Sequence, residues 1–326
     1  MNGQNTPGIA YDLKGAKEQA VKLLLRPNSN VVGIGIGKKV KDGQATPEDC
    51  VRVYVVSKIG PNDLSPNSLV PSNFLGVPTD VIEVGHFGRK GHHTQPREDT
   101  TPRPGSPIRV KTNAPNVNEG QRGTLGAVVT DGTRQYILSC NHILAVNGRV
   151  PKEANIVSAE FVGTEDTIAE PGSFIEFQRD GGNSVDCAVA PLPARTIVQA
   201  TFTDGLGLSP DGPADPQPDM KVTKFGAVTG RTYGTIADID ADLYVDYSFG
   251  TFRFDHQVMI DGGSDTILFA AAGDSGSIAA DTSTKRATAT AMIFAASGRF
   301  AVACPLKLAL EKLAAEAKVN KLSVVV

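Results

Sequence analysis

Apolar and polar residues alternate in short runs along most of the chain, and only two stretches carry a helical period. Residues 12–26 place apolar side chains three and four apart and stop before Pro27, which predicts a helix. Residues 306–317 repeat this spacing after Pro305, with Lys and Glu opposite, and predict a closing amphipathic helix. The remaining short runs, separated by turn-forming residues, indicate a mainly β chain.

Three runs follow the first helix and predict strands at residues 30–40, 51–56 and 80–84. Together with the helix they favour a small α+β domain over residues 1–88. The next segment, residues 89–117, is rich in Pro and charge and predicts an extended linker that buries little and is cut first by proteases.

The first of these strands contains Gly33-x-Gly35-x-Gly37-Lys38, which has the look of a phosphate-binding loop. Such a loop needs a glycine where Val32 stands and a Ser or Thr where Lys39 stands. A glycine-rich strand is therefore favoured. In the same way, Asp238-x-Asp240-x-Asp242 begins like a calcium loop but lacks the required glycine and final glutamate, which favours a strand with one solvated face.

Composition narrows the classes of partner and site. The net charge is −3 with Lys and Arg dispersed, which argues against nucleic acid and anionic membranes as partners. No apolar run approaches the roughly 18 residues of a membrane span, and no secretory signal is visible, so we expect a cytoplasmic protein, with secretion by another route left open. The four cysteines form no CxxC pair and His92-His93 falls in the linker, so we expect no metal, and no cofactor is expected. Cys140 and Cys187 lie inside apolar runs, where small buried thiols are common, so we expect free thiols.

One loop of small residues presents a serine between two apolar runs, in the order Gly273-Asp274-Ser275-Gly276. Glycines allow a sharp turn that aims backbone N–H groups at one point, and a serine there can attack a carbonyl. Most Gly/Ser/Asp clusters are ordinary turns, so the interpretation depends on a base elsewhere in the chain.

His142 is the candidate base, because it is the one histidine of five that directly follows a strand-like apolar run. Asp186 opens another apolar run, where a carboxylate is costly to bury without a partner, and is the candidate orienting acid. The order His142, Asp186, Ser275 differs from that of subtilisin and the α/β-hydrolases, and Ser277 stands where the hydrolase elbow needs glycine.

With these residues in place, the sequence resembles the trypsin/chymotrypsin-like serine peptidases, and more closely a bacterial, disulfide-poor group with an extra N-terminal domain. The matching blocks are residues 30–37, 76–85, 123–126, 137–145, 183–190, 222–234, 273–277 and 294–298. Two features depart from the family: Cys140-Asn141 replaces its usual Ala-Ala, and the activated Ile-Val-Gly-Gly start is absent. In zymogen-type members of the family, the amine released at that start pairs with the acid before the serine. Asp274 must therefore find another partner or stay solvated.

The resemblance implies two six-stranded antiparallel β-barrels, over residues 118–195 and 196–326, with a C-terminal helix. It implies a serine endopeptidase with the triad His142, Asp186 and Ser275 and an oxyanion hole made by the N–H groups of Gly273 and Ser275. The substrate would pair with Phe294, Ala295 and Ala296. Phe269 stands where basic-specific members carry an acid, so a small or apolar residue is expected before the cleaved bond.

Two other functions stay open: a catalytically inactive protease fold that serves as a binding or scaffold protein, and an esterase with the same triad. The expected partner is a protein or peptide substrate. For residues 1–88 the open roles are docking of a regulatory partner, a regulatory cap and a pro-segment.

Overall fold

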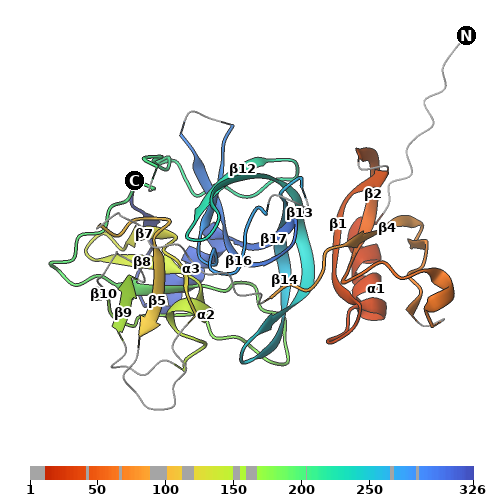
Figure 1. Ribbon diagram of the computed structural model, residues 1–326, viewed down its shortest axis with the longest axis horizontal. Coiled ribbons are helices and arrows are strands. Elements are labelled where there is room, and N and C mark those ends of the chain that lie inside the picture. Colours follow the sequence, from red (N-terminus) through yellow and green to blue (C-terminus); the bar gives the residue numbers. More distant parts are fainter. Residues whose placement is uncertain are drawn as a thin grey trace, which may run out of the picture. The chain divides into compact units, whose positions relative to one another are not determined.

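β-Strands dominate the computed structural model, as the short alternating runs predict (Figure 1). The structure describes residues 12–41, 44–65, 68–88, 101–111, 121–149, 155–158, 167–202, 204–264, 268–283 and 286–326. The chain divides into two compact units, Met1–Glu83 and Val84–Val326. Among the described residues, no helix has the length and apolar character needed to cross a membrane.

The first unit has the α+β character expected from the sequence. Helix α1 (Leu13–Leu24) is capped by Asp12, whose Oδ1 accepts the N–H of Gly15 at 2.9 Å. Strands β1 (Val31–Lys41) and β2 (Gln44–Val55) pair antiparallel, and β2 pairs in parallel with β4 (Val77–Glu83). Helix η1 (Pro61–Asp63) and strand β3 (Asn73–Phe74) lie between β2 and β4 in the chain. The glycine-rich run is thus a strand rather than a phosphate-binding loop.

Six antiparallel strands of the second unit close into a barrel, as expected for residues 196–326. They are β12 (Lys221–Gly226), β13 (Gly230–Tyr247), β14 (Gly250–Asp261), β15 (Ile278–Asp281), β16 (Thr288–Ser297) and β17 (Phe300–Pro305). The order is β12-β15-β16-β17-β14-β13, and β13 pairs again with β12 to close the ring. Apolar side chains from these strands, among them Ile236, Ile260 and Ile293, fill its centre.

The other half of this unit consists of two antiparallel sheets in the described residues. One has the order β10-β9-β5-β6, from β5 (Pro107–Lys111), β6 (Gly123–Thr124), β9 (Asn155–Ser158) and β10 (Thr167–Ala169). The other has the order β11-β8-β7-β18, from β7 (Ala127–Thr130), β8 (Gln135–Ser139), β11 (Ala188–Pro191) and β18 (Ser323–Val324). Helices α2 (Asn141–Leu144) and α3 (Leu306–Glu316) complete the unit, and α3 is the closing helix that the sequence predicts.

Part of the segment expected to be a linker is built into the second unit. Strand β5 lies between β6 and β9, and Pro107 occupies its first position, where a missing N–H costs little. Phe87 is only 1% exposed, and its carbonyl accepts the N–H of Asp246 at 3.0 Å. The linker expected from the proline and charge content is therefore wrong for residues 101–111, because Ile108 and Val110 alternate and supply a buried face to the strand. His92-His93 and the rest of that segment, residues 89–100 and 112–117, lie outside the described residues.

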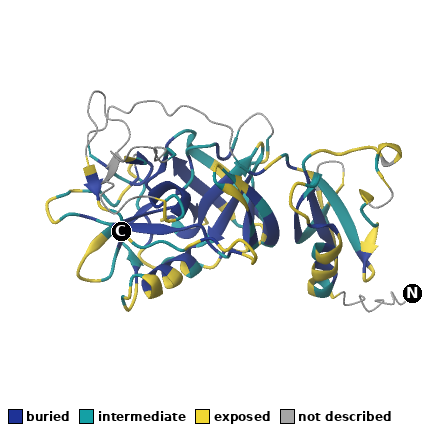
Figure 2. Ribbon diagram, turned by 90° about the horizontal axis from the view of Figure 1, so that it is seen from below, coloured by how far each residue is buried: buried dark blue, intermediate teal, exposed yellow. Residues whose placement is uncertain are grey.

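Burial follows the strands of the second unit, and exposure concentrates in loops and on the outer faces of helices (Figure 2). All four cysteines are buried and free, as expected for reduced thiols. In α3 the buried side is formed by Leu306, Leu310 and Leu313 with small alanines, so the helix packs closely on the unit.

These boundaries predict where the chain can be shortened. A chain of residues 84–326 keeps every described strand of the second unit, so we expect one cooperative thermal transition by circular dichroism. A chain of residues 118–326 lacks Phe87 and the strand between β6 and β9, so we expect it to be insoluble or to lack a cooperative transition. Cooperative unfolding of both chains at the same temperature would contradict the placement of β5.

Candidate active site

His142 is positioned where a buried strand gives way to a short helix. Strand β8 ends at Ser139, Cys140 keeps an extended backbone, and α2 starts at Asn141. The side chain of Asn141 donates to the carbonyl of Ile175 at 2.8 Å, which ties the helix to a neighbouring segment. His142 is 5% exposed, so it is held firmly but still reaches a pocket.

Asp186 reaches His142 because of the register between two strands. Ala188 in β11 pairs with Ser139 in β8, which brings the residues just beyond each strand end together. Asp186 Oδ2 lies 2.5 Å from His142 Nδ1, and its Oδ1 accepts the His142 backbone N–H at 3.2 Å. The carboxylate is fully buried, so these donors replace the water it loses. The contact fixes the orientation of the imidazole ring and points Nε2 away from the acid.

Ser275 lies in a tight loop whose turns need glycine. Gly273 and Gly276 have φ of 105° and 98°, which side chains rarely allow. A Cβ at Gly276 would also collide with Thr124 O and Ser139 Oγ, so the loop sits directly against β6 and β8. The Ser275 carbonyl accepts the Thr124 N–H at 2.7 Å, and Ser275 Oγ donates to the carbonyl of Phe294 at 3.3 Å.

The loop leaves two backbone donors for a ligand. The N–H groups of Asp274, Gly276 and Ser277 donate within the protein, at 2.7–3.0 Å. In the described part of the chain, no hydrogen bond uses the N–H of Gly273 or Ser275. These two groups flank Asp274, which is the arrangement expected for an oxyanion hole.

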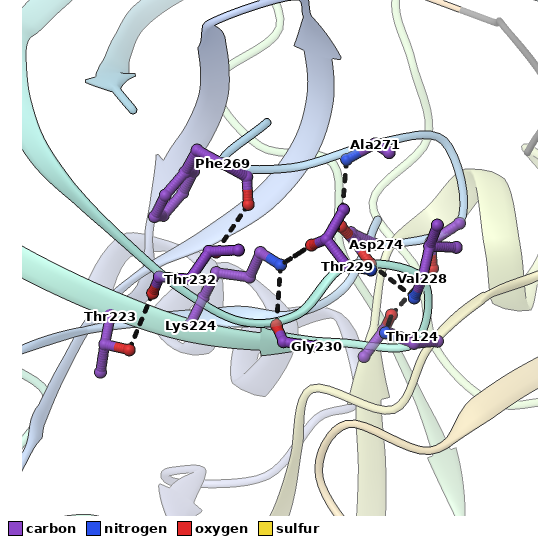
Figure 3. A network of polar contacts seen from close by, with 12 residues as sticks. Thr124, Thr223, Lys224, Val228, Thr229, Gly230, Thr232, Phe269, Ala271 and Asp274 are labelled. Atoms are coloured by element: carbon purple, nitrogen blue, oxygen red, sulfur yellow. Dashed lines mark hydrogen bonds and ion pairs between the residues drawn. The ribbon is translucent and has the colours of Figure 1, made fainter. Parts of the chain in front are cut away.

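Asp274 has the partner that the sequence left open, and it comes from the barrel itself. Its carboxylate is fully buried and accepts hydrogen bonds from two side chains, Lys224 Nζ at 3.2 Å and Thr229 Oγ1 at 2.6 Å (Figure 3). It also accepts hydrogen bonds from the backbone N–H groups of Val228 at 2.8 Å and Ala271 at 3.0 Å. Burial lowers the pKa of Lys224, while the charge of Asp274 opposes that shift. Since Lys224 belongs to β12, the serine loop is held by an ion pair with a strand of the same barrel.

One cavity of about 50 Å³ is lined by both His142 and Ser275. Its wall includes Phe294, Ala295 and Ala296 from β16 and the stretch 271–273. The structure thus brings together the predicted base, nucleophile, loop amides and substrate strand, and places Asp186 directly behind His142.

Phe269 is the predicted site residue that the structure does not bring to this cavity. Its ring is 1% exposed and packs in the barrel core with Ile236 and Ile260. The ring turns inward because Gly234 and Gly262 lack side chains that would crowd it. The wall of the cavity near Ser275 is formed by Ala271 and Ala272 instead.

Two residues that contact the aspartates of the candidate active site were not singled out from the sequence. Lys224 had a signal, since a lysine beside Phe225 in a stretch that begins with Val222 must be paired if that strand is buried. Tyr247 had none, yet its hydroxyl donates to Asp186 Oδ2 at 2.9 Å.

Two groups of side chains in the described residues could hold a metal ion by geometry. The first is Cys140 with His142 and Asp186. Burial raises the pKa of Cys140 well above its usual value, so the thiol stays protonated and donates to the carbonyl of Ile293 at 3.3 Å.

The second group is Asp240, Asp242 and His256. Its members already bond one another, since His256 Nδ1 lies 2.5 Å from Asp240 Oδ1 and the His256 backbone N–H donates to Asp242 Oδ1 at 3.1 Å. The aspartates belong to β13, which is the strand favoured from the sequence over a calcium loop. The expected solvated face of aspartates is wrong, since Asp238 and Asp242 are buried and Ile239 is exposed. Register shifts between β13 and β14 interrupt the alternation of faces.

A scan against protein-family models gives no match, and a search of curated proteins gives none either. Among solved structures, the chain is similar to Thermobifida fusca protease A, with 15% identity, a TM-score of 0.43, and coverage of 68% of this chain and 97% of that one. Cellulomonas bogoriensis chymotrypsin gives 15% identity, a TM-score of 0.42 and coverage of 68% and 97%. A glutamic acid specific serine protease gives 16% identity, a TM-score of 0.45, and coverage of 64% of this chain and 96% of that one. Likenesses this distant carry no argument about function.

The buried ion pair predicts a large effect for one lysine and a small one for its neighbour. Lys224→Met leaves Asp274 buried without its cation, so we expect the free energy of unfolding to fall by about 3–5 kcal/mol. Lys221→Met is the matched control on the same strand, where an exposed contact to Thr235 is worth less than about 1 kcal/mol. Urea denaturation measures both, and equal midpoints for the two variants would refute the role of the pair.

Proposed function

We propose that this chain is a serine endopeptidase that works through His142, Asp186 and Ser275 and an acyl-enzyme. One observation carries the proposal: a histidine paired with a buried carboxylate shares a cavity with a serine whose loop has two uncommitted N–H groups. A turn serving only the fold would have no need for this convergence from three separate segments of the chain.

In the proposed reaction, Ser275 Oγ attacks the substrate carbonyl while His142 Nε2 takes its proton. The hydroxyl must first turn from the Phe294 carbonyl, to which it donates at 3.3 Å, toward the imidazole. Asp186 keeps the proton on Nδ1 and stabilises the imidazolium. The N–H groups of Gly273 and Ser275 receive the oxyanion, and one such donor is worth about 3 kcal/mol of transition-state stabilisation.

His142 then gives its proton to the leaving amine, and an acyl group remains on Ser275. Water enters in place of the amine, His142 removes its proton, and the tetrahedral intermediate collapses to release the acid and the free serine. Both halves use the same two amides and the same imidazole, so no further group is required.

The substrate strand follows from the pairing of β16. Its residues up to Met292 pair with β15, whereas Ala295 and Ala296 pair only with β17 in the described part of the chain. One edge of 294–296 is therefore open to add a peptide as a further antiparallel strand. The nearby wall consists of Ala271, Ala272 and Gly273, so a small or apolar side chain fits before the cleaved bond.

The inactive scaffold is the second candidate, and the serine hydroxyl is the observation that favours it. Ser275 Oγ donates to the Phe294 carbonyl, and the described hydrogen bonds include none between it and His142. Catalytic hydrogen bonds are often loose without substrate, so this observation weighs less than the convergence of the other groups.

A fluorophosphonate probe separates the two candidates. We expect an adduct on Ser275, located by mass spectrometry, that is lost in Ser275→Ala and in His142→Ala and kept in Ser297→Ala, a control on the nearby end of β16. Absence of an adduct on a folded wild-type chain would favour the scaffold.

Regulation by residues 1–83 is part of the proposal: the 84–326 chain should then label with the probe at a different rate from the full-length chain, and an equal rate would argue against regulation.

A peptide library tests the proposed specificity. We expect cleavage after Ala, Val and other small or apolar residues, because the cavity wall beside Ser275 carries alanines and the acid that lines the cavity, Asp246, accepts a hydrogen bond from the Thr251 hydroxyl at 2.6 Å. Cleavage mainly after Arg or Lys would overturn the specificity, and turnover of esters alone would identify an esterase.

A further inference from the structure

We infer that Tyr247 is a positioning residue that holds the Asp186–His142 pair in register with the barrel carrying Ser275. The inference rests on the proposed function and adds a residue to its machinery. The Tyr247 hydroxyl donates to Asp186 Oδ2 at 2.9 Å, and the same oxygen faces His142 Nδ1 at 2.5 Å. Within the described residues, Asp186 thus has three donors, two from His142 and one from Tyr247.

The three residues come from different parts of the second unit. His142 lies on α2 and Asp186 just before β11, both in the half built from two sheets, whereas Tyr247 ends β13 in the hairpin with β14, beyond the pairings of these strands with β12 and β17. Ser275 follows β14 and precedes β15 in the closed barrel to which β13 and β14 belong. The hydroxyl of Tyr247 is therefore a direct polar link between a hairpin of the barrel that carries the nucleophile and the acid that orients the base.

A cluster of aromatic rings fixes the position of this hydroxyl. The Tyr247 ring stacks on Phe249 at 5.3 Å between centroids and lies 5.2 Å from Phe177. It also lies 5.1 Å from the ring of His142, so it covers the pair as well as bonding to it. Rings packed this closely have few alternative rotamers, and the hydroxyl keeps its direction when substrate enters the neighbouring cavity.

The hydroxyl remains a donor at neutral pH. Burial, reinforced by the charge of Asp186, raises the pKa of Tyr247 well above its usual value, so the phenol stays protonated. A donor that shares one carboxylate oxygen with the imidazole draws part of the negative charge to itself. It therefore moderates the His142–Asp186 hydrogen bond as well as holding the carboxylate plane.

A purely structural role would be met by the aromatic ring alone, and one substitution separates the two. Tyr247→Phe keeps the ring and removes only the oxygen. Phe249→Leu is the matched control, because it loosens the stack without touching Asp186. Three quantities are measured on the full-length protein. They are the rate of peptide cleavage, the rate of fluorophosphonate labelling, and the low-field proton resonance of His142 Nδ1–H in water.

For Tyr247→Phe we expect kcat and the labelling rate to fall by on the order of tenfold with KM little changed, since a hydrogen bond to a buried charge is lost. The Nδ1–H resonance should move further downfield, because Asp186 Oδ2 then serves one donor instead of two. For Phe249→Leu we expect the resonance to stay near its wild-type position, whatever its effect on thermal stability.

Wild-type rates and an unmoved resonance in Tyr247→Phe would overturn the inference, as would equal resonance shifts in the two variants. The resonance does not depend on Ser275, so it reports on Tyr247 even if the wild-type chain takes no probe. A shifted resonance in an unlabelled chain would support the link while refuting the proposed peptidase, which keeps the two failures apart.

Discussion

A carboxylate can be buried only where donors replace its water, and two fully buried aspartates impose this condition on the candidate active site. Asp186 and Asp274 are both fully buried, and each is surrounded by groups from at least two elements. Loss of a single donor leaves a charge in a medium that solvates it poorly, at a cost of several kcal/mol. The strands and loops that meet at the site are therefore fixed by the same contacts that prepare its chemistry.

The two aspartates divide the task. Asp274 fixes the shape of the loop around Ser275, because its bonds reach back to Ala271 and across to β12. Asp186 fixes the imidazole, because the pairing of β8 with β11 delivers it to His142. Ser275 belongs to one half of the unit and His142 to the other, so the proposed catalysis depends on how well the halves keep their alignment. Tyr247 contributes to that alignment through a single hydroxyl.

Glycine serves the same end at the loop. Gly273 and Gly276 adopt backbone angles that let the chain reverse twice within a few residues. The turns direct the N–H groups of Gly273 and Ser275 away from internal acceptors, while the N–H groups between and after them are used within the protein. A preorganised pair of donors costs no rearrangement when charge develops on a substrate oxygen.

The sequence by itself determined the mainly β class, the closing helix and the candidates His142, Asp186 and Ser275, because strand-period runs, a terminal helical period and polar residues at run ends are local signals. Proline and charge in residues 101–111 hid a strand, because pairing with β6 and β9 outweighs local propensity. Only the tertiary structure decided that Phe269 turns into the core, that Lys224 neutralises Asp274 and that Tyr247 reaches Asp186. Lys224 lies 50 positions from Asp274 and Tyr247 lies 61 positions from Asp186, and Phe269 packs against Ile236 and Ile260 from other strands. Periodicity and motif spacing carry no information about contacts made across a closed barrel.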